Sequence, residues 1–388
     1  MKIESVTPIA VTLRLQREPM SYCFVRVEMD TGEVGYGEAC DSYGCSYASV
    51  LATLVDDVYA PLLVGRELVA VEQLVDSLRL STRRRLGDGW IAAQARSAVE
   101  IALWDVLGQH LSQSVSSIIG RVRDDVPVYV SGTFLEEGDA AWHADLLQPL
   151  FDRGVRAAKL RLGPNWSEEM GILEELRRMI DPGIELMVDG SETFTVPTAT
   201  RITRRMAAID IAWFEEPIPQ GNHAGLVELG RHAAVPIAYG EHLYGLDEAV
   251  AAMGAAEMSV LQPDAAVCGG IGEARKMAQA AKPFGIRVAL HQCAGPIAMA
   301  ANLHTAATVA SISAVEYGVF SIPAHAALSG SDVFSLDWIV GGRMRLPDTP
   351  GLGVSLDEAF AAEHPYSPPG GRVVGSVGGR ADRFVGHI

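Results

Sequence analysis

Seven residues with acidic, basic or imidazole side chains recur along this chain at almost constant spacing, each at or near the end of a short apolar run. The gaps between them are 30, 26, 26, 23, 27 and 25 residues. A strand, a loop and a helix of a (β/α)8 barrel together take roughly 30 residues, since eight such units fill about 250. The spacing therefore predicts repeated strand–helix units with a functional side chain at the end of each strand. The seven residues are Lys159, Asp189, Glu215, Glu241, Asp264, His291 and Glu316.

Eight apolar runs of strand length carry this spacing, and helical patterns lie between them, for example over residues 167–180, 271–284 and 296–309. Alternating strand and helix signals are typical of a parallel sheet covered by helices. We expect a closed TIM-type (β/α) barrel rather than an open doubly wound sheet, because only a barrel brings consecutive strand ends to one mouth. The eight runs are Val126–Gly132, Val155–Lys159, Ile184–Asp189, Ile211–Glu215, Val235–Glu241, Met258–Asp264, Ile286–His291 and Ile312–Glu316.

The predicted barrel covers residues 125–340 and leaves a segment on each side of it. Residues 1–124 begin with strand-like patterns and continue with helical ones, which predicts an N-terminal α+β domain. Residues 341–388 form a C-terminal segment, in which edge strands are expected over 343–347 and 353–356.

Composition limits the partners that the chain can have. Its net charge of −17 argues against nucleic acid and anionic membranes, although a metal ion and a few cations can still create a local site for an anionic substrate. No run approaches the roughly 20 apolar residues of a membrane span, and the first residues lack the apolar core of a signal peptide. The five cysteines show no metal-ligand spacing, so we expect buried, reduced thiols in a cytoplasmic protein.

Three of the strand-end residues are carboxylates on consecutive predicted strands: Asp189, Glu215 and Glu241. Three carboxylates brought together would repel one another without a cation, and hard oxygen ligands select Mg²⁺ or Mn²⁺. The alternative for each residue alone is a surface acid or a helix N-cap. The trio predicts a magnesium site, and strand alternation predicts that Glu216 points away from Glu215.

Asp264 and His291 end the next two strands and are expected to form a pair. Imidazole titrates near neutral pH, so it can take up a proton and return it. A carboxylate beside it can fix its tautomer and raise its pKa. The alternative is a structural histidine that caps a loop.

Six motifs, taken in order, resemble the mandelate racemase branch of the enolase superfamily over nearly the whole chain. The resemblance implies a modified barrel whose mouth is closed by a capping domain built from the N-terminal segment and the C-terminal tail. It also implies Mg²⁺, a small-molecule carboxylate substrate, abstraction of the proton α to that carboxylate, and a homo-oligomer. Ser191 departs from the family pattern, which has Asn or His at this position. The motifs are Ala95–Gln109, Val188–Gly190, Trp213–Pro217, Leu261–Asp264, Leu290–His291 and Pro347–Gly353.

Lys159 and Arg161 lie two residues apart on one predicted strand, so their side chains share a face. The family motif there is Lys-x-Lys, in which the second Lys is a base, whereas guanidinium is protonated at any working pH. We therefore expect Lys159 and Arg161 to bind the substrate carboxylate. Alternatively, a neighbouring cation lowers the pKa of Lys159 so that it acts as a base.

Glu316 ends the eighth predicted strand, which we expect to lie opposite the second strand across the barrel. In its protonated form it could donate a hydrogen bond to the enediolate, a role that the family gives to a Glu near this position. The alternative is a solvated acid.

Four further residues are candidates for substrate binding. Arg17, Tyr22 and Tyr43 belong to two N-terminal segments that could bind hydroxyls or a distal carboxylate, and His242 follows a predicted metal ligand.

Three functions fit these residues. An acid-sugar dehydratase needs one base on one face of the substrate, and Arg161 in place of a second base favours it. A racemase, epimerase or cycloisomerase shares the first half-reaction, and racemisation needs a second acid or base. A metal-binding protein without activity is the third, and the retained acid and histidine positions argue against it.

Overall fold

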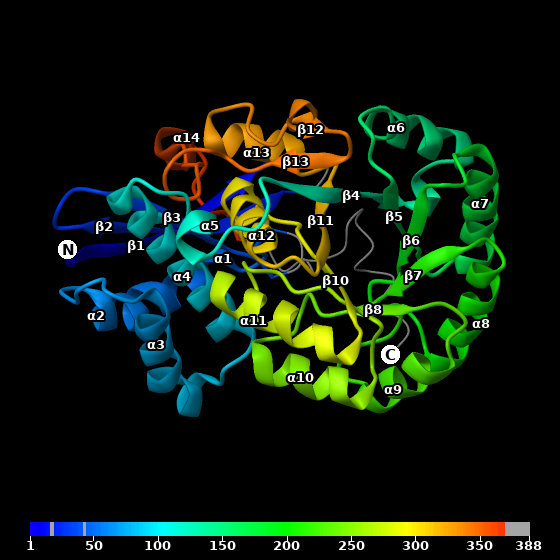
Figure 1. Cartoon of the computed structure of the whole chain (residues 1–388), viewed down its shortest axis with the longest axis horizontal. Helices are drawn as coiled ribbons and strands as arrows, with labels where there is room; N and C mark the ends of the chain where they lie inside the picture. Colours follow the sequence, from blue (N-terminus) through cyan, green and yellow to red (C-terminus); the bar gives the residue numbers. More distant parts are fainter. Residues whose placement is uncertain (16–18, 42–43, 369–388) are drawn as a thin grey trace.

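The computed structural model describes residues 1–15, 19–41 and 44–368, and its centre is a closed barrel of eight parallel strands (Figure 1). Each strand pairs with the next in the sequence, and β11 pairs with β4 to close the ring. This closure confirms the barrel and excludes the open doubly wound sheet. The strands are β4 (Asp125–Phe134), β5 (Ala157–Arg161), β6 (Glu185–Asp189), β7 (Ile211–Glu215), β8 (Ile237–Tyr239), β9 (Val260–Leu261), β10 (Arg287–Leu290) and β11 (Ile312–Gly318).

Helices follow the strands and form the outer layer of the barrel (Figure 1). The three helical patterns noted above correspond to α7, to α11 with a short 3₁₀ turn, and to α12, each within one residue at either end. The helices are α6 (Ala140–Asp152), α7 (Trp166–Met179), α8 (Val196–Ala207), α9 (His223–His232), α10 (Leu246–Ala255), α11 (Ile271–Ala281), α12 (Pro296–Thr308) and α13 (Ile322–Ser329).

The inside of the barrel is filled by side chains. One buried residue from every strand except β5 contributes to a compact cluster within the ring, and Tyr129 and Trp213 meet there edge to face with ring centroids 5.7 Å apart. Such a layer makes the barrel a packed core rather than a pore. The cluster consists of Tyr129, Met187, Trp213, Ala238, Val260, Ala289 and Ala314.

The N-terminal residues form a cap beside the barrel, at the left of Figure 1. Its antiparallel sheet has the order β1–β2–β3, and α4 packs directly on β3. A Cβ at Gly37 would lie 1.8 Å from the carbonyl oxygen of Ala98, so only glycine permits this approach. The elements are β1 (Ile3–Leu13), β2 (Met20–Met29), β3 (Val34–Ala39), α1 (Ala48–Leu54), a π-helix (Val55–Tyr59), α2 (Ala60–Leu63), α3 (Val71–Leu86), α4 (Trp90–Leu111) and α5 (Val115–Ile119).

Two buried carboxylates of the cap bind helix N-termini of the barrel. Glu38 accepts hydrogen bonds from the backbone N–H groups of Gly295 (2.6 Å) and Ala298 (2.9 Å) at the start of α12. Glu100 accepts from the N–H groups of Ile271 (2.8 Å) and Gly272 (2.9 Å) at the start of α11. Free N–H groups at a helix start attract anions, so these contacts fix the cap against the loops that follow β9 and β10.

The C-terminal segment returns to the cap, as expected. The predicted edge strand over 343–347 is confirmed as β13 (Arg343–Arg345), which pairs antiparallel with β4 and with β12 (Ile339–Val340). The strand predicted over 353–356 is wrong, because Gly353 has a φ of +72° and the segment pairs with no strand among the described residues. Helix α14 (Glu358–Glu363) follows, and Glu358 accepts a hydrogen bond from Arg26 of β2 (2.9 Å).

All five cysteines lie in the described part of the chain, where each is buried and free, as predicted. Within the same residue ranges, no helix is both long enough and apolar enough to cross a membrane. The division of the chain at residues 124 and 340 stays a prediction.

His304 of α12 joins barrel, cap and C-terminal segment, and it makes stability depend on pH. Nδ1 accepts from the Ser116 N–H (3.1 Å), and Nε2 donates to the Leu352 carbonyl (3.1 Å), so only the neutral ring satisfies both contacts. Burial lowers the pKa of His304 to about 4. Because folding lowers this pKa, the neutral ring of His304 stabilises the folded protein at pH values above the ordinary histidine pKa of about 6.5. This stabilisation is lost as the pH falls towards 4. The expected loss is about 3 kcal/mol.

We expect His304→Gln, which cannot titrate in this range, to remove that dependence. The free energy of unfolding, measured by urea denaturation between pH 7 and 4, should fall more steeply in the native protein than in the variant. His232→Gln, an exposed change on α9, is the control and should leave the slope unchanged. Parallel curves for the native protein and His304→Gln would contradict the prediction.

Candidate active site

The seven spaced residues meet at the C-terminal mouth of the barrel. Three of them are the last residue of a strand or follow it at once: Asp189 on β6, Glu215 on β7 and His291 after β10. All seven residues are buried, none more than 7% exposed. The prediction that these residues lie together at the mouth is therefore confirmed. The role of each residue stays a prediction.

Lys159 is the centre of a buried ion-pair network. Its Nζ donates to Glu215, lies 3.1 Å from Oε1 of Glu316 and lies 3.9 Å from Oδ2 of Asp189. Burial alone would lower the pKa of Lys159, but the attraction of these carboxylates outweighs it and holds the pKa well above its ordinary value. The environment thus favours a charged ammonium, as carboxylate binding requires, over a base.

Arg161 lies beside Lys159 at the end of β5. Its Nε is 3.3 Å from Oδ2 of Asp189, and its Nη1 donates to the carbonyl oxygen of Gly132 (3.0 Å). Its Nη2 lies 3.7 Å from Sγ of Cys293. The guanidinium therefore adds a second cation to the same side of the mouth.

Glu316 departs from its prediction in two ways. It does not lie opposite Lys159, because β11 closes the ring against β4, the neighbour of β5. Nor does its environment favour the protonated form. Burial would raise the pKa of Glu316, but the attraction of Lys159, followed by that of His291 and Arg161, lowers it to about 2. Its Oε2 accepts a hydrogen bond from the Tyr129 hydroxyl (3.0 Å).

The three predicted metal ligands are buried and held by neighbours. Asp189 accepts from the N–H (2.7 Å) and the hydroxyl (3.1 Å) of Ser191, and Glu215 accepts from the side-chain amide of Gln262 (2.6 Å). Burial raises the pKa of Glu215 to about 8 and that of Glu241 to about 7. Burial makes the ionised form of these carboxylates costly, and a bound cation would offset that cost. Carboxylate oxygens are hard ligands, which suit a small divalent cation such as Mg²⁺.

The trio does not form one tight cluster in this structure. Among the described residues, two groups of three side chains bring their ligand atoms within 4.8 Å of one another. They are Glu216 with Glu241 and His242, and His291 with Cys293 and Glu316. The ammonium of Lys159 contacts Glu215 and Asp189, and the metal role of the trio stays a prediction.

The predicted pair of Asp264 and His291 is present. Nδ1 of His291 lies 2.9 Å from Oδ2 of Asp264, and Nε2 lies 3.5 Å from Oε2 of Glu241. Burial would lower the pKa of His291, but Glu241 and then Asp264 hold it well above its ordinary value. The carboxylate thus fixes one ring nitrogen and leaves the other directed to the mouth.

Asn302 of α12 clamps this pair and was missed in the sequence. Its Nδ2 donates to Oδ1 of Asp264 (2.9 Å) and to the carbonyl oxygen of His291 (3.2 Å), while its Oδ1 accepts from the N–H of Ala265 (2.9 Å). An Asn inside an apolar helix pattern, which is fully buried here, was the available signal.

His242 contacts a different part of the mouth. Its Nδ1 lies 3.2 Å from Oε1 of Glu216 and 3.8 Å from Oε1 of Glu241, and its ring stacks on Trp90 of the cap with centroids 6.5 Å apart. Strand alternation does not place Glu216, because β7 has ended and the residue has a φ of +36°. Ser191, with a φ of +42°, is also left-handed, so two residues at this mouth have a strained backbone.

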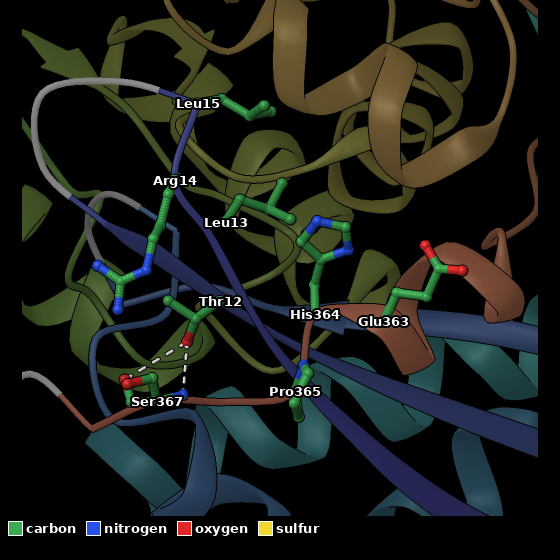
Figure 2. A pocket seen from close by; sticks show the side chains of 8 residues that line it. All are labelled: Thr12, Leu13, Arg14, Leu15, Glu363, His364, Pro365 and Ser367. Carbon is green, nitrogen blue, oxygen red and sulfur yellow. Dashed lines mark hydrogen bonds between the residues drawn. The ribbon is translucent and has the colours of Figure 1, made fainter.

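The other substrate-binding candidates are less informative. Tyr22 is buried and stacks on Phe24, whereas Arg17 and Tyr43 lie outside the described residues. A cavity of about 410 Å³ lies between β1 and the C-terminal segment, and none of the seven residues lines it. Figure 2 shows the side chains that line this cavity. We therefore place the candidate active site by side-chain chemistry at the mouth. The cavity is lined by Thr12, Leu13, Arg14, Leu15, Glu363, His364, Pro365 and Ser367.

Enzymes built on barrels of this type carry their active sites at the mouth, which is where these polar side chains meet. Comparison with protein families gives the finer assignment. The model of the mandelate racemase / muconate lactonizing enzyme N-terminal domain matches residues 3–120, and the enolase C-terminal domain-like model matches residues 142–360. The chain belongs to the enolase superfamily, in its mandelate racemase branch.

Relatives with assigned activities cover nearly the whole chain. A D-galactarolactone cycloisomerase of Agrobacterium fabrum is 27% identical over 367 residues, which span 93% of this chain and 95% of the relative. An arabinonate dehydratase of Saccharolobus solfataricus is 28% identical over 90% of this chain and 92% of its own. A 3,6-anhydro-alpha-L-galactonate cycloisomerase of Streptomyces coelicolor is 30% identical over 86% and 88%.

Solved structures agree with this fold. A member of the enolase superfamily from a Polaromonas species superposes with a TM-score of 0.86 at 26% identity, covering 95% of this chain and 98% of the other. These relatives include dehydratases, which are lyases, and cycloisomerases, which are isomerases, so the chain is an enzyme of one of these two kinds.

Proposed function

We propose that this enzyme removes the proton α to the carboxylate of an acid sugar and then eliminates the β-hydroxyl as water, which gives an enol that takes up a solvent proton at C3 and ketonises to a 2-keto-3-deoxy acid. The observation that carries the proposal is the distribution of charge across the mouth. The paired His291 lies after β10, and two cations, Lys159 and Arg161, lie on β5. One base with a carboxylate-binding side suffices for β-elimination, whereas racemisation needs a second group that exchanges protons.

His291 is the base in this proposal and acts in its neutral form, which a cation bound at Glu241 would favour because it offsets the carboxylate charge that raises the pKa of His291. Its Nε2 takes the α-proton, and the electrons of the C–H bond form the C–C double bond of the enediolate. The β C–O bond then breaks, and the leaving hydroxyl takes the proton from His291 and departs as water. The hydrogen bond from Nδ1 to Asp264 supports this cycle, because it fixes the tautomer and stabilises the imidazolium.

Lys159 and Arg161 bind the substrate carboxylate and its developing charge. Guanidinium and ammonium are strong hydrogen-bond donors to carboxylates, and the high pKa of Lys159 keeps it charged. Glu316 maintains that charge by its contact with Lys159. Asp189, Glu215 and Glu241 would hold Mg²⁺, or Mn²⁺, which when bound acts as a Lewis acid on the carboxylate oxygens. The homo-oligomer belongs to the same proposal, on the strength of the family resemblance, and so does the cytoplasmic location, on the strength of the five buried, free cysteines.

The test is a screen of the purified enzyme with Mg²⁺ against mono- and diacid sugars. We expect a product one water lighter than the substrate, an α-keto acid that semicarbazide detects, and solvent deuterium at C3 when the reaction runs in ²H₂O. Interconversion of two stereoisomers without keto acid would overturn dehydration.

Cycloisomerisation is the second candidate, because two of the relatives bear that name. It begins with the same proton abstraction and is therefore served by the same residues. The mass of the product separates the two reactions, since an isomerisation leaves it unchanged. Sugar lactones and anhydro-sugar acids are therefore included in the screen.

A further inference from the structure

We propose that His291, Cys293 and Glu316 form a second cation site, selective for a borderline or soft dication such as Zn²⁺, whose occupation inhibits the enzyme. The three side chains are each no more than 3% exposed, and their ligand atoms all lie within 4.8 Å of one another. They offer a nitrogen, a sulfur and an oxygen, which is a donor set that Zn²⁺ binds and Mg²⁺ does not prefer.

The geometry of His291 is that of a zinc ligand. Metal-binding histidines commonly donate the hydrogen of their second ring nitrogen to a carboxylate, which fixes the tautomer and strengthens the ligand. Asp264 already provides this contact at 2.9 Å to Nδ1. Nε2, which lies 3.5 Å from Oε2 of Glu241, is then the ligand atom that His291 offers to the cluster.

Cys293 contacts one of the other two proposed ligands and one cation of the mouth. Its Sγ is 3.9 Å from Oε1 of Glu316 and 3.7 Å from Nη2 of Arg161. With Zn–S near 2.3 Å and Zn–N near 2.0 Å, tetrahedral ligand atoms are roughly 3.5 Å apart, so a contraction of about 1 Å suffices. Three protein ligands leave the fourth position for water.

The surrounding charge permits a second dication. Lys159 and Arg161 border the cluster and oppose it, and Lys159 must release Oε1 of Glu316. Lys159 keeps Glu215 and Asp189 as partners when it does so. The carboxylates gathered at the mouth outnumber these two cations, so the local field remains attractive to a positive ion.

Inhibition follows because the site engages Nε2 of His291, and this part rests on the function proposed above. A zinc-bound imidazole has no free lone pair to take the α-proton. The contacts of the Cys293 thiol are with Arg161 and Glu316, which are not predicted magnesium ligands, so Cys293 can be varied separately from that site.

The binding test uses Co²⁺ as a spectroscopic probe with Mg²⁺ present in saturating amount. We expect a near-ultraviolet thiolate-to-cobalt absorption in the native enzyme, its loss in Cys293→Ser and Cys293→Ala, and its retention in Cys268→Ser. Cys268 is also buried and serves as the matched control. Equal spectra in the native enzyme and both Cys293 variants would overturn the site, whether or not a substrate is known.

The inhibition test adds Zn²⁺ at saturating Mg²⁺ and compares each variant with its own zinc-free rate. Cys293→Ser should need at least about 10-fold more Zn²⁺ for half-inhibition, since weaker perturbations of zinc shells already cost 10- to 100-fold in affinity. Inhibition that excess Mg²⁺ relieves equally in native and variant enzyme would place Zn²⁺ at the magnesium ligands and reject the proposal. A cobalt–thiolate band without inhibition by Zn²⁺ would support the cation site. It would contradict the role of His291 as the base.

Discussion

His291→Asn is expected to abolish exchange of the substrate α-proton together with turnover. Asn keeps a hydrogen-bond donor for Asp264 but has no basic nitrogen, so the variant lacks the group that takes the proton. Removal of a positioned general base typically costs 10²- to 10⁴-fold in rate, and we expect a loss in that range or beyond. Exchange is measured by proton NMR in ²H₂O, which reports the first step even when no product forms.

Two comparisons sharpen this experiment. Asn302→Ala removes the clamp on Asp264 and on the His291 backbone but retains the imidazole, so exchange should slow less than in His291→Asn. His325→Gln is the control for a buried histidine outside the predicted pair, whose ring contacts the Ala294 carbonyl. If exchange survived in His291→Asn, the base would lie elsewhere, and Lys159 would be examined next despite its raised pKa.

The sequence predicted the barrel because its signal is local and repeated. Each strand is a short apolar run, and each ends next to a polar residue such as Asp189 or Glu215, so the mouth followed from strand order alone. The pair of Asp264 and His291 was accessible for the same reason, since consecutive strands are neighbours in the sheet.

Contacts that depend on closure of the barrel could not be predicted from the order of the strands. Glu316 reaches Lys159 because β11 meets β4, a pairing between residues almost 190 positions apart. The ammonium consequently sits among carboxylates, which decides the charge states of both Lys159 and Glu316. Spacing along the chain contains no information on these distances.

The side chains outside the strands that hold the site residues in place were not predicted either. Asn302 approaches the pair from α12, and Glu38 fixes the start of that helix from the cap. Such positions are set by helix rotation and by docking of the cap, which depend on packing of many side chains. Cys293 illustrates the same limit, because a cysteine that spacing treats as isolated acquires its neighbours His291 and Glu316 only in the folded mouth.

Glu215→Gln is expected to remove the response to Mg²⁺ and nearly all activity. The substitution exchanges one ligand oxygen for an amide N–H₂, which cannot bind a cation, and Mg²⁺ affinity should fall by at least 10- to 100-fold. Lewis-acid stabilisation is worth several kcal/mol, so a loss of about 10³-fold in turnover, equivalent to about 4 kcal/mol, is expected. Calorimetric titration with Mg²⁺ and turnover under saturating Mg²⁺ measure the two effects.

The structure also predicts a cost in stability for Glu215→Gln. Glu215 accepts hydrogen bonds from Lys159, Gln262 and Trp213, and the new amide hydrogens would face donors. Lys159 keeps Glu316 and Asp189, so the expected loss is about 1–3 kcal/mol rather than that of a fully orphaned charge. Urea denaturation without Mg²⁺ measures it, with Glu228→Gln, an exposed change on α9, as the matched control. Unchanged Mg²⁺ affinity in Glu215→Gln would remove this residue from the ligand set, because a lost oxygen ligand must weaken binding whatever the reaction catalysed.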